Sequence, residues 1–185
     1  MEKIGVILAR LQPIHIGHLA LIEKACKEND KVFVFIGSAD KFNIRNPLPI
    51  SIRMQLANEA IDNLATDTPI KIVPLDDLTD ETDNSHDWGF YLYSKIVTEI
   101  QCSNFTIYYS DGFEIITTWF PSFILRNNVS LCLLARNATV DGISATKVRK
   151  MIEEDDDNLQ DYVPSCVYNN RETIKKHIEL SKLIK

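Results

Sequence analysis

A chain of 185 residues that is 45% hydrophobic and 25% charged has the composition of a folded globular protein, which excludes disorder as its dominant state. Its 20 basic side chains against 26 acidic ones leave a net charge of −6, the opposite sign to that of a non-specific nucleic-acid binder. We therefore expect no nucleic-acid partner. No apolar run approaches the ~18 residues that cross a bilayer, and the short apolar start lacks a signal-peptide cleavage site, so we also expect no membrane association.

The length favours a single domain, which we place at residues 1–185, with residues 166–185 as a C-terminal helical extension. The four cysteines are far apart and form no CxxC pair, which predicts neither a zinc knuckle nor a redox motif. Cysteines inside apolar runs are typical of small buried thiols. We therefore expect a reducing, cytoplasmic compartment.

The first segments along the chain are predicted to be a strand, a helix and a second strand. Residues 3–9 (KIGVILA) and 31–37 (KVFVFIG) are short apolar runs rich in β-branched residues, which are typical of buried strands in a parallel sheet. Between them, residues 16–27 carry apolar side chains at near-helical spacing. Together these segments predict a βαβ unit.

The alternation continues along the rest of the chain. Ser51 is a plausible N-cap of the next helix, and the acidic run at 153–157 is expected to be a solvated helix end. We predict strands at 70–75, 105–110 and 129–135, and helices at 51–64, 88–100, 113–119, 144–154 and 171–183. Such alternation indicates an α/β fold with an open, doubly wound parallel sheet. Because ligands of such sheets bind beyond the carboxyl ends of the strands, the segments that follow the strands are the candidate site.

The segment after the first strand, residues 9–18 (ARLQPIHIGH), contains two of the chain's four histidines. If a helix begins near Ile16, His15 and His18 flank its N-terminus, where free N–H groups and the helix dipole attract anions. Gly17 would let a ligand approach the backbone closely. This arrangement is suited to holding a polyphosphate.

The segment after the last predicted strand, residues 141–150 (DGISATKVRK), begins another helix. Ser144 is a good N-cap, and Ser144, Thr146 and the first-turn N–H groups could bind phosphate oxygens. Lys147 and Arg149 add positive charge near the same end. By itself this segment fits an ordinary capped helix with exposed basic residues equally well, so both interpretations stay open.

Several familiar site motifs are absent from the sequence. It contains no Walker A motif, no GxGxxG fingerprint and no GxSxG nucleophile elbow. His86 and His177 have no neighbours at metal-ligand spacing, so we predict no protein-bound metal site.

Taken together, HIGH at 15–18 and ISATKVR at 143–149 resemble the nucleotidyltransferase superfamily built around HxGH and ISxTxxR, which implies a Rossmann-like nucleotidyltransferase fold. The sequence is most similar to the archaeal-like nicotinamide mononucleotide adenylyltransferases. Further matches are RLQP at 10–13, GSA at 37–39, NPL at 46–48, Arg53, Asn84 and Trp88. Three positions depart from that pattern, because Ala9 replaces a glycine and Leu11 and Leu48 replace aromatic residues.

The resemblance implies transfer of an adenylyl group from ATP to nicotinamide mononucleotide, giving NAD and pyrophosphate, with Mg²⁺ on the phosphates and a homo-oligomeric assembly. The attacking group would be the mononucleotide's own ionised phosphate, so no general base is required. The catalytic residues implied are Arg10, His15, His18 and Arg149. Those implied for ATP are Leu11, Gln12, Gly17, Arg136, Ile143, Ser144 and Thr146. Those implied for the mononucleotide are Gly37, Ser38, Arg45, Asn46, Arg53, Asn84, Trp88 and Trp119.

Two alternatives to this function stay open. A sister enzyme, either a phosphopantetheine adenylyltransferase or a cytidylyltransferase, shares both main motifs but typically opens with a GxFDPxH-like string. A nucleotide sensor that has lost turnover is supported only by Ala9. For Trp88, stacking on the nicotinamide ring and packing in the core are both compatible with the sequence, and the same holds for Trp119.

Overall fold

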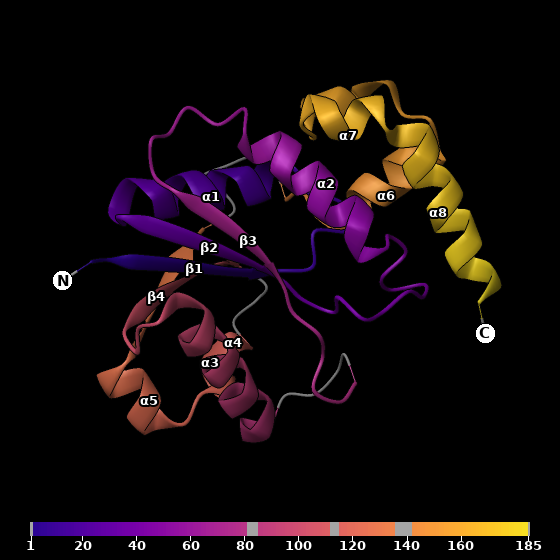
Figure 1. Ribbon diagram of the computed structural model, residues 1–185. Coiled ribbons are helices and arrows are strands. Elements are labelled where there is room, and N and C mark those ends of the chain that lie inside the picture. The colour runs from indigo at the N-terminus through magenta and orange to yellow at the C-terminus, as the bar shows by residue number, and fades with distance from the viewer. Residues whose placement is uncertain (1, 81–84, 112–114, 136–141, 185) are drawn as a thin grey trace.

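A computed structural model describes residues 2–80, 85–111, 115–135 and 142–184. Its centre is a parallel five-stranded sheet in the order β3-β2-β1-β4-β5, and Figure 1 shows it between two layers of helices. The strands are β1 (Ile4–Ala9), β2 (Lys31–Ile36), β3 (Ile70–Pro74), β4 (Phe105–Ser110) and β5 (Val129–Leu134). All five were predicted, with ends that differ by one residue at most, and the doubly wound α/β fold is confirmed.

The helices alternate with these strands. They are α1 (Ile16–Glu28), α2 (Ile50–Ile61), α3 (His86–Ile100), α4 (Ile116–Trp119), α5 (Ser122–Asn127), α6 (Ala145–Glu153), α7 (Ser165–Asn169) and α8 (Arg171–Leu183), with a 3₁₀ turn at Asp157–Asp161. Because the strand order reverses direction between β1 and β4, the carboxyl ends of these two strands form the switch point at which such sheets bind ligands.

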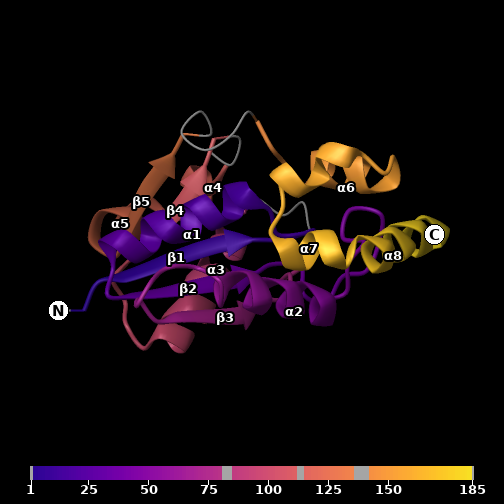
Figure 2. The same cartoon turned by 90° about the horizontal axis from the view of Figure 1, so that it is seen from above.

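Side chains alternate between two cores, one on each face of the sheet. On β2, Val32 and Val34 face a core shared with α1, α2 and α6, whereas Phe33 and Phe35 face a core shared with α3, α4 and α5. This two-sided burial explains why the central strands are apolar at every position. Figure 2 shows that α6, α7 and α8 extend beyond one end of the sheet.

The N-cap predicted for α2 is wrong. Pro49 occupies that position without a side-chain hydrogen bond, and Ser51 is exposed in the first turn. Proline fits a helix start because its φ is preset and it has no N–H to satisfy. The short helices α5 and α7 were not predicted; each follows a proline, Pro121 or Pro164, and is too short to display a helical period.

The last helix is tied to α6 by charged side chains. Lys182 pairs with Glu153, and Lys175 lies 2.6 Å from Asp155, so the acidic run is a helix end as predicted, held by two lysines of α8. Ile174 and Ile178 bury the inner face of α8. In the described part of the chain, no helix combines the length and apolar character needed to cross a bilayer.

Candidate active site

A cleft of about 510 Å³, which we call the carboxyl-end cleft, opens where the carboxyl ends of β1, β2 and β4 meet α6 and the loop after β3. It contains residues from both motif segments of the sequence, which lie more than a hundred residues apart. The predicted site residues that line it are Arg10, Leu11, Gln12, His18, Gly37, Ser38, Arg45, Trp88, Trp119, Thr146 and Arg149.

The two histidines cap the start of α1. Nδ1 of His15 accepts a hydrogen bond from the Gly17 N–H at 3.2 Å, and Nδ1 of His18 accepts one from the His15 N–H at 3.3 Å. The ring centroids are 3.8 Å apart. A ring nitrogen that accepts a hydrogen bond carries no proton, so the neutral form of each imidazole is protonated at Nε2. The capping geometry thus gives each ring an Nε2–H donor.

The free amide groups expected at this helix start are already occupied. The N–H of Ile16 donates to Tyr162, that of Gly17 to His15, and that of His18 to the His15 carbonyl. Gly17 does not face open space either, because a Cβ there would lie 3.1 Å from the His15 ring and 3.3 Å from Ile143. The glycine therefore allows the histidine cap and the close approach of Ile143, and these three amides of α1 are not free to bind an anion.

Arg149 joins the two motif segments directly. Its Nη1 donates to the Gln12 carbonyl at 2.8 Å and its Nη2 to Thr146 Oγ1 at 3.3 Å. Burial lowers the pKa of Arg149, and repulsion by Arg10 lowers it further. Since a Cβ at Gly17 would lie only 3.3 Å from Ile143, the residues that lead into α6 pack against the start of α1.

Ser144 is the N-cap of α6 as predicted, with Oγ accepting from the Lys147 N–H at 3.2 Å. Neither Ser144 nor Ile143 lines the cleft, whereas Thr146 does. The Lys147 ammonium lies over the Tyr162 ring at 5.1 Å. Of the predicted residues on α6, Thr146 and Arg149 are thus the ones that line the cleft.

Arg53 is buried beneath the cleft instead of lining it. Its Nη1 donates to the carbonyls of Arg10 and Gly37 at 2.9 and 2.8 Å, and its Nη2 donates to that of Ser38 at 2.9 Å. Burial, with repulsion from Arg10, lowers its pKa to about 10. The side chain therefore fixes the backbone at the ends of β1 and β2 and has no exposed surface for a phosphate.

Gln12 and Asn46 also serve the loops around the cleft. The Gln12 side-chain amide is buried and makes two hydrogen bonds to the Leu48 backbone. Gln12 Nε2 donates to the Leu48 carbonyl at 3.3 Å, and the Leu48 N–H donates to Gln12 Oε1 at 2.9 Å. Asn46 is fully buried and does not line the cleft. It lies in a turn in which its backbone N–H donates to Asn43 Oδ1. Arg45, its exposed neighbour, does.

Two residues of the cleft wall have left-handed backbone. Leu11 has φ 49° and Ser38 has φ 51°, a conformation that costs a residue with a Cβ about 1–3 kcal/mol and clusters at functional sites. They follow β1 and β2, the strands whose ends Arg53 ties together. The buried arginine thus stabilises the loop conformations that shape the cleft.

Trp88, Tyr91 and Trp119 form one side of the cleft region, which we call the aromatic wall, and its packing depends on a close contact between α3 and α4. Trp88 lies 5.8 Å from Trp119, edge to face, and 5.6 Å from Tyr91, and only 7% of its surface is exposed. At Gly89 a Cβ would overlap the Trp119 carbonyl oxygen, so α3 and α4 can meet only over a glycine. Trp88 and Trp119 are both core residues and cleft residues, and stacking on a ligand ring stays a prediction.

Other cleft residues were absent from the predicted set: Leu8, Ala9, Leu21, Asp77, Asp80, Tyr109, Ser110 and Ala145. Tyr109 and Ser110 end a strand that was predicted correctly, so the strand-end rule could have found them. The predicted residues Asn84 and Arg136 lie outside the described residues.

Acidic side chains lie next to this aromatic wall. Asp77 accepts a hydrogen bond from Ser38 Oγ at 3.2 Å, and Tyr91 donates to the Asp76 carbonyl at 3.0 Å. Burial raises the pKa of Tyr91, and the carboxylates of Asp76, Asp40 and Asp77 add to that effect. Among the described residues there is no cluster of three or more His, Cys, Asp or Glu side chains that could hold a metal ion.

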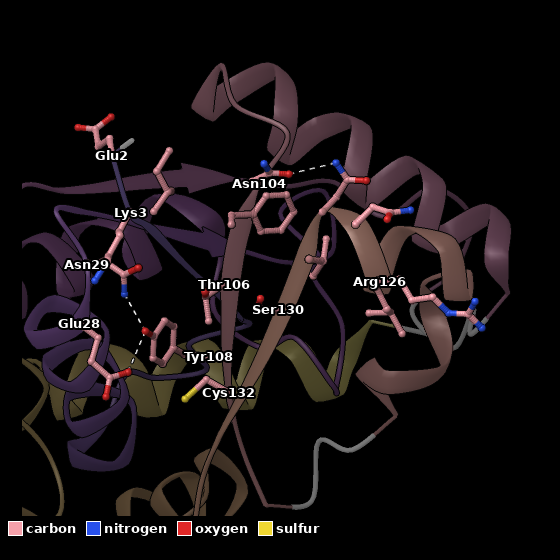
Figure 3. Close-up of a pocket in the computed structure, with 16 residues that line it drawn as sticks. Glu2, Lys3, Glu28, Asn29, Asn104, Thr106, Tyr108, Arg126, Ser130 and Cys132 are labelled. Carbon is pink, nitrogen blue, oxygen red and sulfur yellow. Dashed lines mark hydrogen bonds between the residues drawn. The ribbon is translucent and has the colours of Figure 1, made fainter.

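A second hollow, of about 650 Å³, lies at the amino ends of β1, β4 and β5. Figure 3 shows this amino-end hollow, with the Tyr108 hydroxyl between Asn29 and Glu28. The hydroxyl accepts from Asn29 Nδ2 at 2.7 Å and donates to Glu28 Oε2 at 2.9 Å. It contains none of the predicted site residues.

The convergence of the two motifs agrees with a family comparison. A model of the family described as "Cytidylyltransferase-like" matches residues 9–151, which include both motifs. The chain belongs to the cytidylyltransferase-like family. This confirms the resemblance to the nucleotidyltransferase superfamily.

Similar proteins of this family carry a more specific name. A nicotinamide-nucleotide adenylyltransferase of Thermococcus onnurineus is 30% identical over 97 residues, which are 52% of this chain and 50% of that protein, so the match spans about half the length of the relative. One of Sulfurisphaera tokodaii is 26% identical over 175 residues, 92% of this chain and 91% of the relative.

A solved structure has the same fold. It is a bifunctional NMN adenylyltransferase/ADP ribose pyrophosphatase from Francisella tularensis, complexed with AMP and a manganese ion, with a TM-score of 0.72 at 20% identity. The alignment covers 98% of this chain and 52% of that protein. At this identity the likeness supports the Rossmann-like nucleotidyltransferase fold.

Proposed function

We propose that the protein transfers the adenylyl group of ATP to nicotinamide mononucleotide, forming NAD and pyrophosphate. The observation that carries the proposal is the single carboxyl-end cleft that gathers Arg10, His18 and Arg149 beside an aromatic wall. The names of the archaeal relatives support the choice of substrates.

The charge of the cleft favours a polyanion. Burial lowers the pKa of Arg53 to about 10 and also lowers that of Arg149, and in both cases Arg10 contributes by repulsion. The Arg10 guanidinium therefore lies close enough to disfavour the charged forms of both Arg53 and Arg149. A bound triphosphate would relieve this repulsion through charge-assisted hydrogen bonds.

In the proposed reaction, an oxygen of the mononucleotide's 5′-phosphate attacks the α-phosphorus of ATP. The new bond joins that oxygen to the phosphorus, the bond to the β-phosphate bridging oxygen breaks, and pyrophosphate leaves with the electron pair. The attacking phosphate is already ionised, so the protein needs only to align the reactants and neutralise charge.

His18 and Arg149 are the side chains we assign to the leaving group. The Nε2–H of His18 would donate to a phosphate oxygen, with the ring held by its bond from the His15 N–H. Arg149 would exchange its bond to the Gln12 carbonyl for bonds to the departing phosphates. Arg10 and Arg45 would hold the remaining phosphate charge, and Thr146 the β- or γ-phosphate.

How a divalent cation would bind depends on which metal-ligating side chains the described residues bring together. Since the described residues form no cluster of metal ligands, they do not fit a protein-held metal centre. We propose Mg²⁺ as the ion that enters with the ATP phosphates, because it prefers phosphate and water oxygens. We also propose a cytoplasmic homo-oligomer, with light scattering as the measurement of its assembly.

A panel of substrates tests the proposal. The purified protein is incubated with ATP or CTP and with nicotinamide mononucleotide, phosphopantetheine or glycerol phosphate, and pyrophosphate release is measured. Product is expected from ATP and the mononucleotide. The family description makes a sister cytidylyltransferase the second candidate, and turnover of glycerol phosphate with CTP, but none of the mononucleotide, would establish it. Tight binding of both substrates without product would instead indicate a sensor.

A further inference from the structure

The loop between β2 and α2 forms one side of the carboxyl-end cleft, which its residues Ser38 and Arg45 line. Both ends of this loop are anchored from below. The Ser38 carbonyl accepts a hydrogen bond from the buried Arg53, and the Leu48 N–H donates to Gln12. Arg45 lies between these anchors and is exposed, so its position depends on what holds the middle of the loop.

The middle of this loop contacts the C-terminal helix. Phe42 is half-buried, and its ring centroid lies 6.2 Å from that of His177 on α8, edge to face. Aromatic pairs at this separation stabilise a structure beyond the area that they bury. Figures 1 and 2 both show the loop next to α8, although the two segments are far apart in the sequence. Helix α8 therefore contacts the loop that carries Arg45.

The His177 ring is held by packing on a helix that is itself anchored. Its Nδ1 is buried and has no hydrogen-bond partner within the part of the chain that the structure describes. On either side of it along α8, Ile174 and Ile178 are buried and Lys182 pairs with Glu153 of α6. The ring thus gives Phe42 a fixed surface to pack against.

We propose that His177 and Phe42 are positioning residues, through which α8 holds the loop where Arg45 can bind the phosphate of the mononucleotide. The inference rests on the proposed function, which assigns phosphate charge to Arg45. Neither aromatic ring lines the cleft, so both act on the substrate through the loop. Without their contact the loop would spend less time in its binding position, and the apparent affinity would fall by the same fraction.

The test compares His177→Ala and Phe42→Ala with the wild type. The measurements are kcat and KM for the mononucleotide at saturating ATP, its dissociation constant by calorimetry, and the rate of tryptic cleavage after Arg45. KM and the dissociation constant should rise about three- to tenfold, the equivalent of one aromatic pair. The kcat should stay unchanged, because the leaving group is assigned to His18 and Arg149. Cleavage should be faster, since trypsin needs a released backbone.

Three further variants sharpen the test. His177→Phe keeps a ring and loses no hydrogen bond at Nδ1, so it is expected to behave as the wild type. The double alanine variant should be no worse than His177→Ala, because either substitution removes the same contact. Phe123→Ala is the matched control: its ring lies 6.2 Å from that of Phe90 and does not line the cleft, and it should leave all the readouts unchanged.

Two results would overturn the inference. One is unchanged cleavage after Arg45 in both alanine variants, and the other is faster cleavage with an unchanged dissociation constant. If His177→Ala does not fold, Phe42→Ala removes the same contact from the side of the loop. A wild type that neither binds nor turns over the mononucleotide would count against the proposed function alone, because the cleavage rate tests the loop contact without a substrate.

Discussion

The sheet is hollowed at both ends, and the two hollows differ in how their charges are arranged. The amino-end hollow has a volume of about 650 Å³ and the carboxyl-end cleft one of about 510 Å³. Its polar groups bond to one another: Tyr108 to Asn29 and Glu28, and Asn128 to Asn104. Two acidic residues, Glu2 and Glu28, and two basic ones, Lys3 and Arg126, line this hollow, so the two signs are equal in number.

In the carboxyl-end cleft, by contrast, three arginines (Arg10, Arg45 and Arg149) outnumber two carboxylates (Asp77 and Asp80). Arg10 contributes to lowering the pKa of both Arg53 and Arg149, and two residues beside it have left-handed backbone. Left-handed backbone and mutually repelling arginines cluster at functional sites, so these features favour a ligand-binding role for this end of the sheet. The comparison teaches that the volume of a hollow does not by itself point to a site, whereas an excess of one charge at the strand ends favours one.

The largest expected effect is a loss of kcat when a side chain of the carboxyl-end cleft is removed, compared with no loss for a residue of the amino-end hollow. His18→Ala and Arg149→Ala should each lower kcat by about 100- to 1,000-fold, the cost of removing one preorganised donor, ~2.7–4 kcal/mol. The mononucleotide dissociation constant should change far less. Arg126→Ala, which removes an arginine of the amino-end hollow, is the control and should leave kcat unchanged. Equal losses in kcat and in mononucleotide affinity would contradict the role given to His18.

The next effect concerns the aromatic wall. Gly89→Ala places a methyl group against the Trp119 carbonyl and should lower the free energy of unfolding by about 3 kcal/mol, at the upper end of overpacking costs. Gly37→Ala is the control for stability, because its Cβ would meet no atom closer than 3.8 Å. Denaturant unfolding of both variants measures the difference. A Gly89→Ala protein as stable as the wild type would mean that α3 and α4 do not meet as described.

Substitution of Arg53 tests whether the backbone at the ends of β1 and β2 is stabilised by this buried guanidinium group. Arg53→Met leaves three carbonyls without their donor, and we expect a loss of about 2–3 kcal/mol in unfolding free energy together with reduced activity. Arg45→Met, on an exposed residue of the same cleft, should reduce activity without that loss of stability. Unchanged stability in Arg53→Met would show that the residue acts on the ligand and not on the loops.

The smallest expected effect is on stability and concerns Tyr108 in the amino-end hollow. Burial is the main cause that raises the pKa of Tyr108, from 10.0 to about 12, so the folded state holds the proton more tightly than the unfolded chain. Its contribution to stability is therefore complete below about pH 10 and is lost as the pH rises towards 12. Tyr108→Phe should cost about 1 kcal/mol near neutral pH and flatten the alkaline decline. A decline as steep as that of the wild type would contradict the assignment.

The sequence predicted the strands well because each central strand is apolar on both faces. It also predicted the Ser144 cap, which depends on neighbours in the chain, and it placed His15 and His18 at the start of α1. It did not predict that Arg53 turns inward, because that depends on three separate segments meeting in space. It also did not predict that the His15 ring caps the Gly17 N–H, a local contact that the expectation of free amides at this helix start left out. A motif residue indicates a type of chemistry, whereas the direction of its side chain is set by the fold.

A crystal structure of the protein soaked with NAD and pyrophosphate tests the central claim most directly. We predict that the phosphates lie in the carboxyl-end cleft, within hydrogen-bonding distance of both His18 and Arg149, with the Arg149 bond to the Gln12 carbonyl exchanged for a phosphate. Nucleotide bound in the amino-end hollow, or phosphates that contact only one of the two side chains, would contradict it.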